Sequence, residues 1–365
     1  MATNRHGISP DLVIHPGETI SDILEDRNLT QKELAKRAGV SEPFLSDVIH
    51  GKKDISKALA MGLEYALGVP SSFWLNLQAN YDAELLSLQQ EESIHEGERE
   101  VYGAIHEVVD YLTQFEFIPS DLTQDQTIIH LRKHFKVSSL LGLKELAPTG
   151  AFRMSGTATV DPDVLGAWLC LCKVQGERKH VSESFDKEHV DQLVYEIKTV
   201  MCNPKGDLQK TLTTLFAQYG IDFSILHNFR GAPVHGYIDR KEDGSYQMVA
   251  TIRGSYADIF WFSIFHELGH IVNGDLSKPG SFIDANDSDD QGSEDAADQF
   301  ASESLLDPIS YAAFERNGLF SISSIKSFAY SQNVPPYIVI GRLQKEGKIP
   351  WNRFAKYKPR YKWAE

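Results

Sequence analysis

The residues that point most directly to chemistry form the sequence HELGH at positions 266–270. On an α-helix, positions i and i+4 lie on one face, so the imidazoles of His266 and His270 can bind one metal ion. Glu267 lies beside this pair, where its carboxylate can take a proton from a water molecule on the metal. The motif therefore predicts a zinc site that carries out hydrolysis.

A catalytic zinc ion needs a third protein ligand and leaves its fourth position to water. We assign this ligand to Glu294, at the start of a predicted helix downstream of His270. Asp298 lies one turn later on the same face. We expect it to support the site, because ligating histidines usually donate their second N–H to a carboxylate. Four other acidic residues remain alternatives for the third ligand: Asp284, Asp287, Asp295 and Glu303.

Ser255 and Asp258 form a predicted capping box for the helix that carries HELGH, and Gly274 ends this helix. A second helix is predicted from about Glu294 to Asp307. Two aromatic side chains of the first helix are predicted to lie in the core: Trp261 and Phe265.

The region before the HELGH helix alternates between helix and strand patterns. An amphipathic helix over residues 208–219 precedes a strand with the sequence IDFSIL, and residues 232–254 read as a hairpin that turns at Glu242-Asp243-Gly244. These patterns predict an α+β fold that is mostly helical, with a small β-sheet.

The N-terminal region is typical of five short helices between residues 15 and 82. Pro16 can open the first helix, and the next four begin at potential N-caps: Thr30 (with Glu33 at the capping-box position), Ser41, Ser56 and Ser71. Glycines at 39, 51 and 68 can end helices. The predicted domains are 10–82, a helical connector over 83–145, which contains one helix or a helix pair and a further short helix, and 146–365.

The third N-terminal helix, from Ser41 to His50, takes the place of a recognition helix in the major groove. Its polar face offers no Arg, Asn or Gln for bidentate contact with bases. Residues 1–80 hold eight Lys and Arg against ten Asp and Glu, which is weak for a phosphate-binding domain. The predicted DNA contacts are Gln31, Ser41, Phe44, Ser46, Lys52 and Lys53. A domain that keeps the fold but binds protein remains the alternative.

Composition indicates which partners and which cellular compartment are compatible with the sequence. The chain of 365 residues has a net charge of −15, so any nucleic-acid binding must come from a local patch. Three cysteines do not form a disulfide framework, and we expect a reducing compartment. The N-terminus does not resemble a signal peptide, and we find no membrane span, so the expected location is the cytoplasm.

Smaller signals concern single side chains. Cys170 and Cys172 would share one face of a strand but are expected to be buried in the core. Cys202 is a weaker candidate for an inhibitory zinc ligand, and His235 and Tyr256 for groups that stabilise an oxyanion.

Two stretches resemble known families. FWFSIFHELGHIVNGD, EDAADQFASESLLDP and SIKSFAYSQNVPPYIVIGRLQKEGKIPWNRF are similar to the ImmA/IrrE metallopeptidases, over roughly Leu146 to Trp363. The resemblance implies a zincin-like fold, zinc bound by His266, His270 and Glu294, and Glu267 as general base. The family's usual Leu-Leu-Met-Pro is Leu305-Leu306-Asp307-Pro308 here.

Residues Ile14 to about Asp82, from HPGETISDILEDRNLTQKELAKRAGVSEPF onward, resemble the HigA-type antitoxins, which are Cro/repressor-like (XRE) helix-turn-helix proteins. That resemblance implies operator binding and autorepression, often as a homodimer.

Together these features predict a transcriptional regulator with a zinc-dependent endopeptidase domain that cleaves a helix-turn-helix repressor or itself, in a stress, mobile-element or toxin–antitoxin response. Single-stranded DNA is a candidate activator. The alternative is a non-proteolytic HigA-like antitoxin or repressor, whose metal domain senses a signal or binds a partner such as a toxin.

Overall fold

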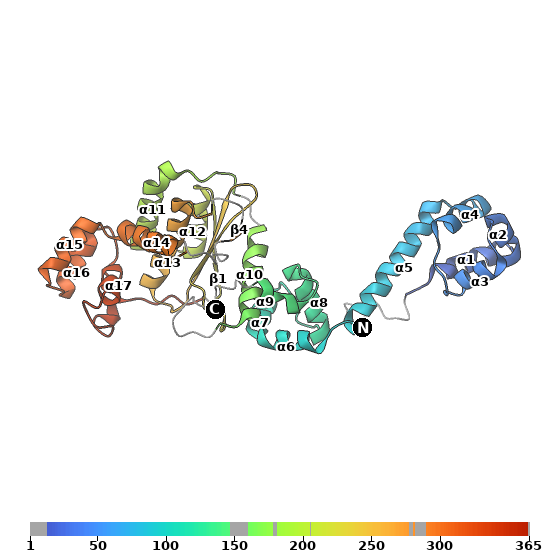
Figure 1. The fold of residues 1–365 in the computed structure, drawn as a ribbon, viewed down its shortest axis with the longest axis horizontal. Coiled ribbons are helices and arrows are strands. Elements are labelled where there is room, and N and C mark those ends of the chain that lie inside the picture. The colour runs from blue at the N-terminus through green and yellow to red at the C-terminus, as the bar shows by residue number, and fades with distance from the viewer. Residues whose placement is uncertain are drawn as a thin grey trace. The chain divides into compact units, whose positions relative to one another are not determined.

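The computed structural model describes residues 13–146, 160–177, 181–204, 206–276, 280–281 and 290–363. The chain forms two compact units, and Figure 1 labels their α-helices and two of the strands, β1 and β4. The first unit comprises Met1–Arg99 and Pro119–His130, and the second comprises Glu100–Ile118 and Leu131–Glu365. In the described parts, no helix is long and apolar enough to cross a membrane.

The first unit opens with five α-helices, as predicted: α1 (Pro16–Asp26), α2 (Gln31–Ala38), α3 (Glu42–Ile49), α4 (Lys57–Leu67) and α5 (Ser71–Glu92). Three predicted N-cap hydroxyls accept a hydrogen bond from a first-turn N–H: Thr30, Ser41 and Ser56. Gly39 and Gly68 end α2 and α4 with left-handed φ angles of 69° and 71°. The carboxylate of Glu33 bonds to Arg37 instead of completing the predicted capping box at Thr30.

The helices of this unit pack around an apolar core that includes Ile20, Leu34, Leu45, Leu59, Leu63 and Trp74. A Cβ atom on Gly17 of α1 would lie 2.2 Å from the carbonyl oxygen of Val48, so α1 approaches α3 closely only because residue 17 is glycine. The buried Gln78 of α5 accepts a hydrogen bond from the Ile55 N–H at 2.8 Å. This bond fixes the loop that follows α3.

The predicted connector is helical but more divided than the sequence indicates. Helix α5 runs past residue 82, and three further α-helices and a short 3-10 turn follow before the last one: α6 (Glu96–Ala104), α7 (His106–Gln114), α8 (Gln124–Phe135), η2 (Leu140–Gly142) and α9 (Leu143–Leu146). At the end of α5 the Ser93 hydroxyl donates to the Gln90 carbonyl and competes with helical bonding. The domain limits at 82 and 145 stay predictions.

The second unit contains a small mixed sheet covered by helices (Figure 1). After α7 and α9, this unit continues with the helices α10 (Pro162–Glu177), η4 (Lys187–His189), α11 (Val190–Cys202) and α12 (Leu208–Ala217). Its strands are β1 (Ile221–Leu226), β2 (Gly236–Arg240), β3 (Tyr246–Thr251) and β4 (Gly280–Ser281). The strand order is β1-β3-β2-β4. β1 lies parallel to β3, whereas β2 pairs antiparallel with β3 and β4. The predicted strand and hairpin are therefore confirmed.

The remaining helices are α13 (Ala257–Asn273), α14 (Asp290–Leu305), α15 (Pro308–Asn317), α16 (Ile322–Ser331), α17 (Pro336–Lys345) and the short η6 (Ala355–Tyr357). Helix α13 packs against β2, β3, α14 and α17. Trp261 and Phe265 are fully buried in this core, as predicted. A Cβ atom on Gly269 would lie 3.0 Å from the Cα atom of Ala297, so α13 and α14 approach closely.

Three local predictions need correction. Tyr256, not Ser255, is the N-cap of α13, and no side chain caps it: Ala257 N–H donates to the Pro359 carbonyl instead. Asp258 pairs with Lys358 rather than forming a capping box. Cys170 and Cys172 are buried, as expected, but on helix α10 rather than on a strand, in a stretch that is buried on all its faces. A helix with no polar face lacks the periodicity that reveals it. Helix α14 also begins at Asp290, one turn earlier than predicted.

Candidate functional site

The three predicted metal ligands meet between α13 and α14. The Nε2 atoms of His266 and His270 lie 3.1 Å apart. The Glu294 carboxylate lies 3.2 Å from the first of them and 3.7 Å from the second. In the described parts of the chain, these three side chains form the group whose ligand atoms could hold a metal ion.

Each histidine is oriented by a carboxylate at its other ring nitrogen. Asp298 lies 2.9 Å from Nδ1 of His266, where its carboxylate can accept the ring N–H. Asp275, in the turn after α13, lies 2.8 Å from Nδ1 of His270. A proton on each Nδ1 directs the Nε2 lone pairs toward each other and toward Glu294, which is the donor geometry that suits a cation. Sequence reasoning missed Asp275, although its position directly after Gly274 could have indicated it.

The electrostatics of the two histidines differ. Burial lowers the pKa of His266, but hydrogen bonds with Asp298 and Glu294 outweigh burial and raise this pKa to about 10. Burial dominates at His270 and lowers its pKa despite the hydrogen bond that its ring donates to Asp275. The carboxylates of Glu294 and Asp298 therefore favour a positive charge at His266. A proton or a bound metal ion can supply this charge.

Glu267 lies beside the metal-ligand group and under strand β2. The side chain is buried, and a Cβ atom on Gly236 would lie 2.3 Å from its Oε1 atom. Burial raises the pKa of Glu267 to about 7, a value suited to proton transfer near neutral pH. Gly236 is thus required where the strand passes over the carboxylate.

The alternative ligands and helpers have other surroundings. Glu303 accepts a hydrogen bond from Gln299 on α14, and Asp295 is exposed. Asp284 and Asp287 lie outside the described residues. Cys202 contacts the carbonyl oxygen of Asn333 at 3.4 Å and is not in the metal-ligand group.

Of the two predicted oxyanion donors, His235 lies near the histidines. Its pKa is lowered to about 4 by burial, then by the charges of Arg253 and His266. Its Nε2 atom lies 3.0 Å from Arg253. Tyr256 instead contacts Lys358 and Arg360 through its ring.

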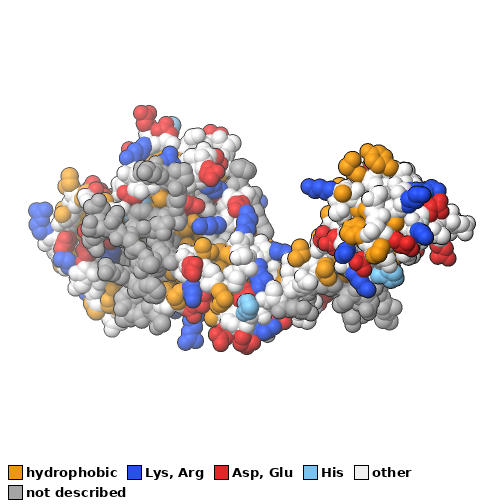
Figure 2. All heavy atoms as spheres, turned by 45° about the vertical axis from the view of Figure 1, so that its right-hand side comes forward, with side chains coloured by type: hydrophobic (Ala, Val, Ile, Leu, Met, Phe, Trp, Pro, Cys, Tyr) orange, Lys and Arg blue, Asp and Glu red, His pale blue; other side chains and the backbone are white. Residues whose placement is uncertain are grey.

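The predicted DNA contacts lie on or near α3. This helix begins at Glu42, one residue after Ser41, where the predicted recognition helix begins. The Ser41 hydroxyl caps α3, and Phe44 is half-buried against the core. Lys53 pairs with Asp47 at 2.9 Å and lies over the Phe44 ring, whereas Lys52 is exposed. Ser46 faces His50, and Gln31 begins α2. On the face seen in Figure 2, Lys and Arg side chains of this domain are interspersed with acidic ones.

Comparison with known proteins concerns this first domain. A helix-turn-helix family model matches residues 20–74. The chain is 39% identical over 69 residues to virulence-associated protein A′ of Dichelobacter nodosus, an alignment covering 19% of this chain and 60% of that protein. The chain thus spans less than two thirds of this curated relative.

Two solved structures are also similar. A putative antidote protein of a plasmid maintenance system from Nostoc punctiforme is 39% identical, with 22% of this chain and 86% of that chain covered and a TM-score of 0.21. Antitoxin HigA of Pseudomonas aeruginosa, solved with the higBA promoter, is 28% identical, with 23% and 96% covered and a TM-score of 0.21. The five helices and the family match define a helix-turn-helix DNA-binding domain. The N-terminal part of the chain thus carries a helix-turn-helix domain of XRE type.

Proposed function

We propose that the chain is a regulator in which this DNA-binding domain is joined to a zinc-dependent endopeptidase. The observation that carries the proposal is the convergence of His266, His270 and Glu294, with the buried Glu267 beside them. Two imidazole nitrogens and one carboxylate are the protein donors of catalytic zinc sites that keep one position open. The hydrogen bonds that His266 and His270 donate to Asp298 and Asp275 fix the tautomers that such ligands need.

A bound zinc ion would polarise a peptide carbonyl and make a water molecule more acidic. Glu267 would accept the proton of the attacking water and deliver it to the departing amine, because its buried carboxylate lies beside the metal-ligand group and is not one of the three ligands. His235 has a pKa of about 4 and is therefore neutral at this pH, so it serves as a hydrogen-bonding group rather than as a cation.

Strand β2 is the proposed docking element for the substrate. Gly236 of β2 lies against the carboxylate of Glu267, so a peptide whose carbonyl reaches the metal-ligand group would pass close to this end of the strand. The proposed substrate is an extended segment of a helix-turn-helix repressor or of this protein itself. Operator DNA is the proposed ligand of the first domain.

The test incubates the zinc-loaded full chain with candidate repressors and follows the products by intact mass. We expect wild type to cleave a repressor or itself and Glu267→Gln to be inactive. Glu303→Gln makes the same change at the surface of α14 and should remain active. If Glu267→Gln releases repression normally in cells, the peptidase proposal is wrong and the metal domain has a sensing or partner-binding role.

A further inference from the structure

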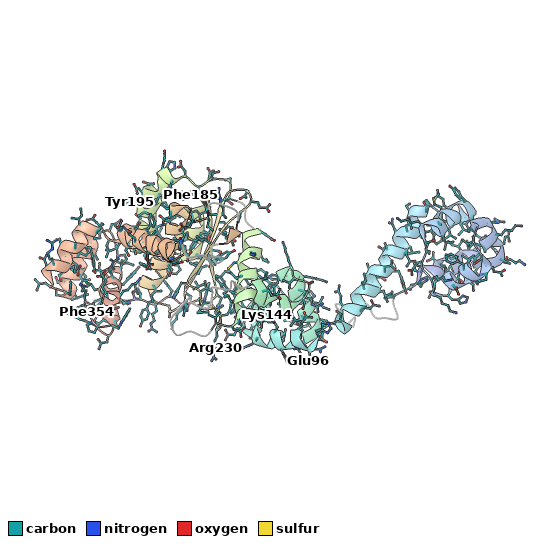
Figure 3. All side chains as sticks on the ribbon, viewed as in Figure 1. Glu96, Lys144, Phe185, Tyr195, Arg230 and Phe354 are labelled. Carbon is teal, nitrogen blue, oxygen red and sulfur yellow. The ribbon has the colours of Figure 1, made fainter. Side chains whose placement is uncertain are left out.

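Residues 351–363, which we call the basic segment, differ sharply from the rest of the chain. They contain four Lys and Arg residues besides the buried Lys358, no Asp or Glu, and five aromatic residues, in a protein with a net charge of −15. The surplus of positive charge is therefore local. Figure 3 labels Phe354 of this segment, on the red C-terminal part of the ribbon.

The basic segment is held in a defined conformation against the second unit. Lys358 is buried, with Nζ 2.7 Å from Asp258 and 2.9 Å from the side-chain oxygen of Gln344. The Tyr361 N–H donates to the Ser255 carbonyl at 2.7 Å, beside the bond from Ala257 to Pro359. These bonds fix the backbone, so a ligand of this surface meets a preorganised site rather than a chain that must first be ordered.

Cations and rings alternate along the segment. Arg353 lies over the ring of Phe354 at 4.9 Å, and Lys356 lies over the ring of Tyr357 at 5.3 Å. Lys326 of α16 lies over the same Tyr357 ring at 5.2 Å. Arg360 lies over Tyr256 at 4.3 Å. The Arg353 guanidinium also donates to the Phe320 carbonyl at 2.8 Å, and that of Arg360 donates to the Tyr256 hydroxyl. Each guanidinium keeps further N–H groups that can bind an anion.

The positive charge of the segment is not neutralised locally. Arg353, Lys356, Arg360 and Lys362 are exposed, and none of them forms an ion pair with a carboxylate in the described part of the chain. Two indole rings are exposed as well: Trp351 with 66% of its surface and Trp363 with 37%. Large exposed aromatic rings beside unpaired cations are unusual on a surface that binds nothing.

We propose that the basic segment is a binding surface for single-stranded nucleic acid, separate from the helix-turn-helix domain. The four exposed cations would contact successive phosphates, and Trp351 would stack on a base, as would the face of Trp363 that does not stack on His227. A single strand fits better than a duplex, because the base faces of a duplex are already stacked on one another. An acidic peptide would match the charges but would offer no flat partner for the indoles. This inference does not depend on the metal chemistry.

The test measures fluorescence anisotropy of a labelled oligothymidylate of about 20 nucleotides with the full chain, across a series of salt concentrations. Lys356→Glu/Lys362→Glu should raise the Kd at least about tenfold at low salt. It should also reduce the slope of log Kd against log salt by about 1.4, because each phosphate that a cation neutralises adds roughly 0.7 to the slope. Lys133→Glu/Lys210→Glu changes the charge equally at exposed sites on α8 and α12 and should bind as wild type does.

Stacking is tested separately. Trp351→Ala should raise the Kd about tenfold, whereas Trp351→Phe should keep most of the affinity because phenylalanine also stacks. Circular dichroism confirms that each variant is folded. Lys52→Glu, in the first domain, should leave oligothymidylate binding unchanged.

Two results would overturn the proposal. One is oligothymidylate binding that is absent at low salt or is unaffected by both the Lys356/Lys362 and the Trp351 changes. The other is equally strong competition by polyglutamate or by random duplex, which would show a general polyanion surface that does not read bases.

Discussion

Asp275 offers the sharpest test of how the metal site is built. Its carboxylate holds Nδ1 of His270 at 2.8 Å, and only 19% of its side chain is exposed. Loss of such an orienting partner typically weakens metal affinity 10- to 100-fold, which is about 1.4–2.8 kcal/mol. Asparagine can still accept the N–H as a neutral group, and neutral hydrogen bonds are roughly half as strong as charge-assisted ones. We therefore expect about tenfold for Asp275→Asn and up to about a hundredfold for Asp275→Ala.

The assay is competition for zinc with a chromophoric chelator, using full-length protein. Asp295→Asn is the matched control, because Asp295 is an exposed carboxylate on α14 next to Glu294 and lies outside the metal-ligand group. It should bind zinc as wild type does. Equal zinc affinities for wild type and Asp275→Ala would refute the argument that carboxylates at Nδ1 preorganise the ligands.

Four further outcomes are expected. Glu294→Ala should lose bound zinc in elemental analysis, and unchanged stoichiometry would pass the ligand role to another acid. Glu267→Gln should keep the zinc content while peptide cleavage falls roughly 10²- to 10⁴-fold, and cleavage at the wild-type rate would remove Glu267 as general base. The pKa of His235 is about 4 in the folded protein and 6.5 in the unfolded chain, so the unfolded chain binds a proton first as the pH falls. The free energy of unfolding therefore decreases between pH 6.5 and 4, by at most about 3 kcal/mol. His235→Gln should remove this pH dependence, and an unchanged pH profile would contradict the pKa shift. Lys52→Ala should weaken operator binding and reduce the slope of log Kd against log salt by roughly 0.9. Lys53→Ala should have a smaller effect, because Lys53 is already paired with Asp47. Equal effects of the two substitutions would show that the Lys53–Asp47 pair opens when DNA binds.

The parts of the structure that sequence predicts well are those governed by local rules. His266, His270 and Asp298 follow from helical spacing, and the N-caps at Thr30, Ser41 and Ser56 follow from hydroxyl chemistry before an apolar repeat. The convergence of α13 and α14 adds Glu294 to the histidines, as the spacing of the motif predicts.

The parts that sequence reasoning missed depend on contacts between distant residues. The start of α13 is completed by the Pro359 carbonyl and by Lys358, so Ser255 and Asp258 match a capping pattern that the fold does not use. Helix α10 is buried on every side and therefore shows no amphipathic period. The sequence places Lys53 close to the end of α3, but it does not show whether the charge of Lys53 is available to DNA. In the structure this charge is paired with Asp47 of α3.

The pairing of Asp258 with Lys358 also affects the order in which the two parts of the chain can fold during synthesis. Asp258 is buried, and a buried carboxylate without its partner costs several kcal/mol. Lys358 leaves the ribosome only after the whole region from α13 to α17 has been made. Until Lys358 has been made, helix α13 cannot pack in its final position with the charge of Asp258 neutralised. The helix-turn-helix domain, whose core lies entirely within the first 74 residues, is complete long before. A newly made chain therefore has a folded helix-turn-helix domain before the proposed metal site is assembled.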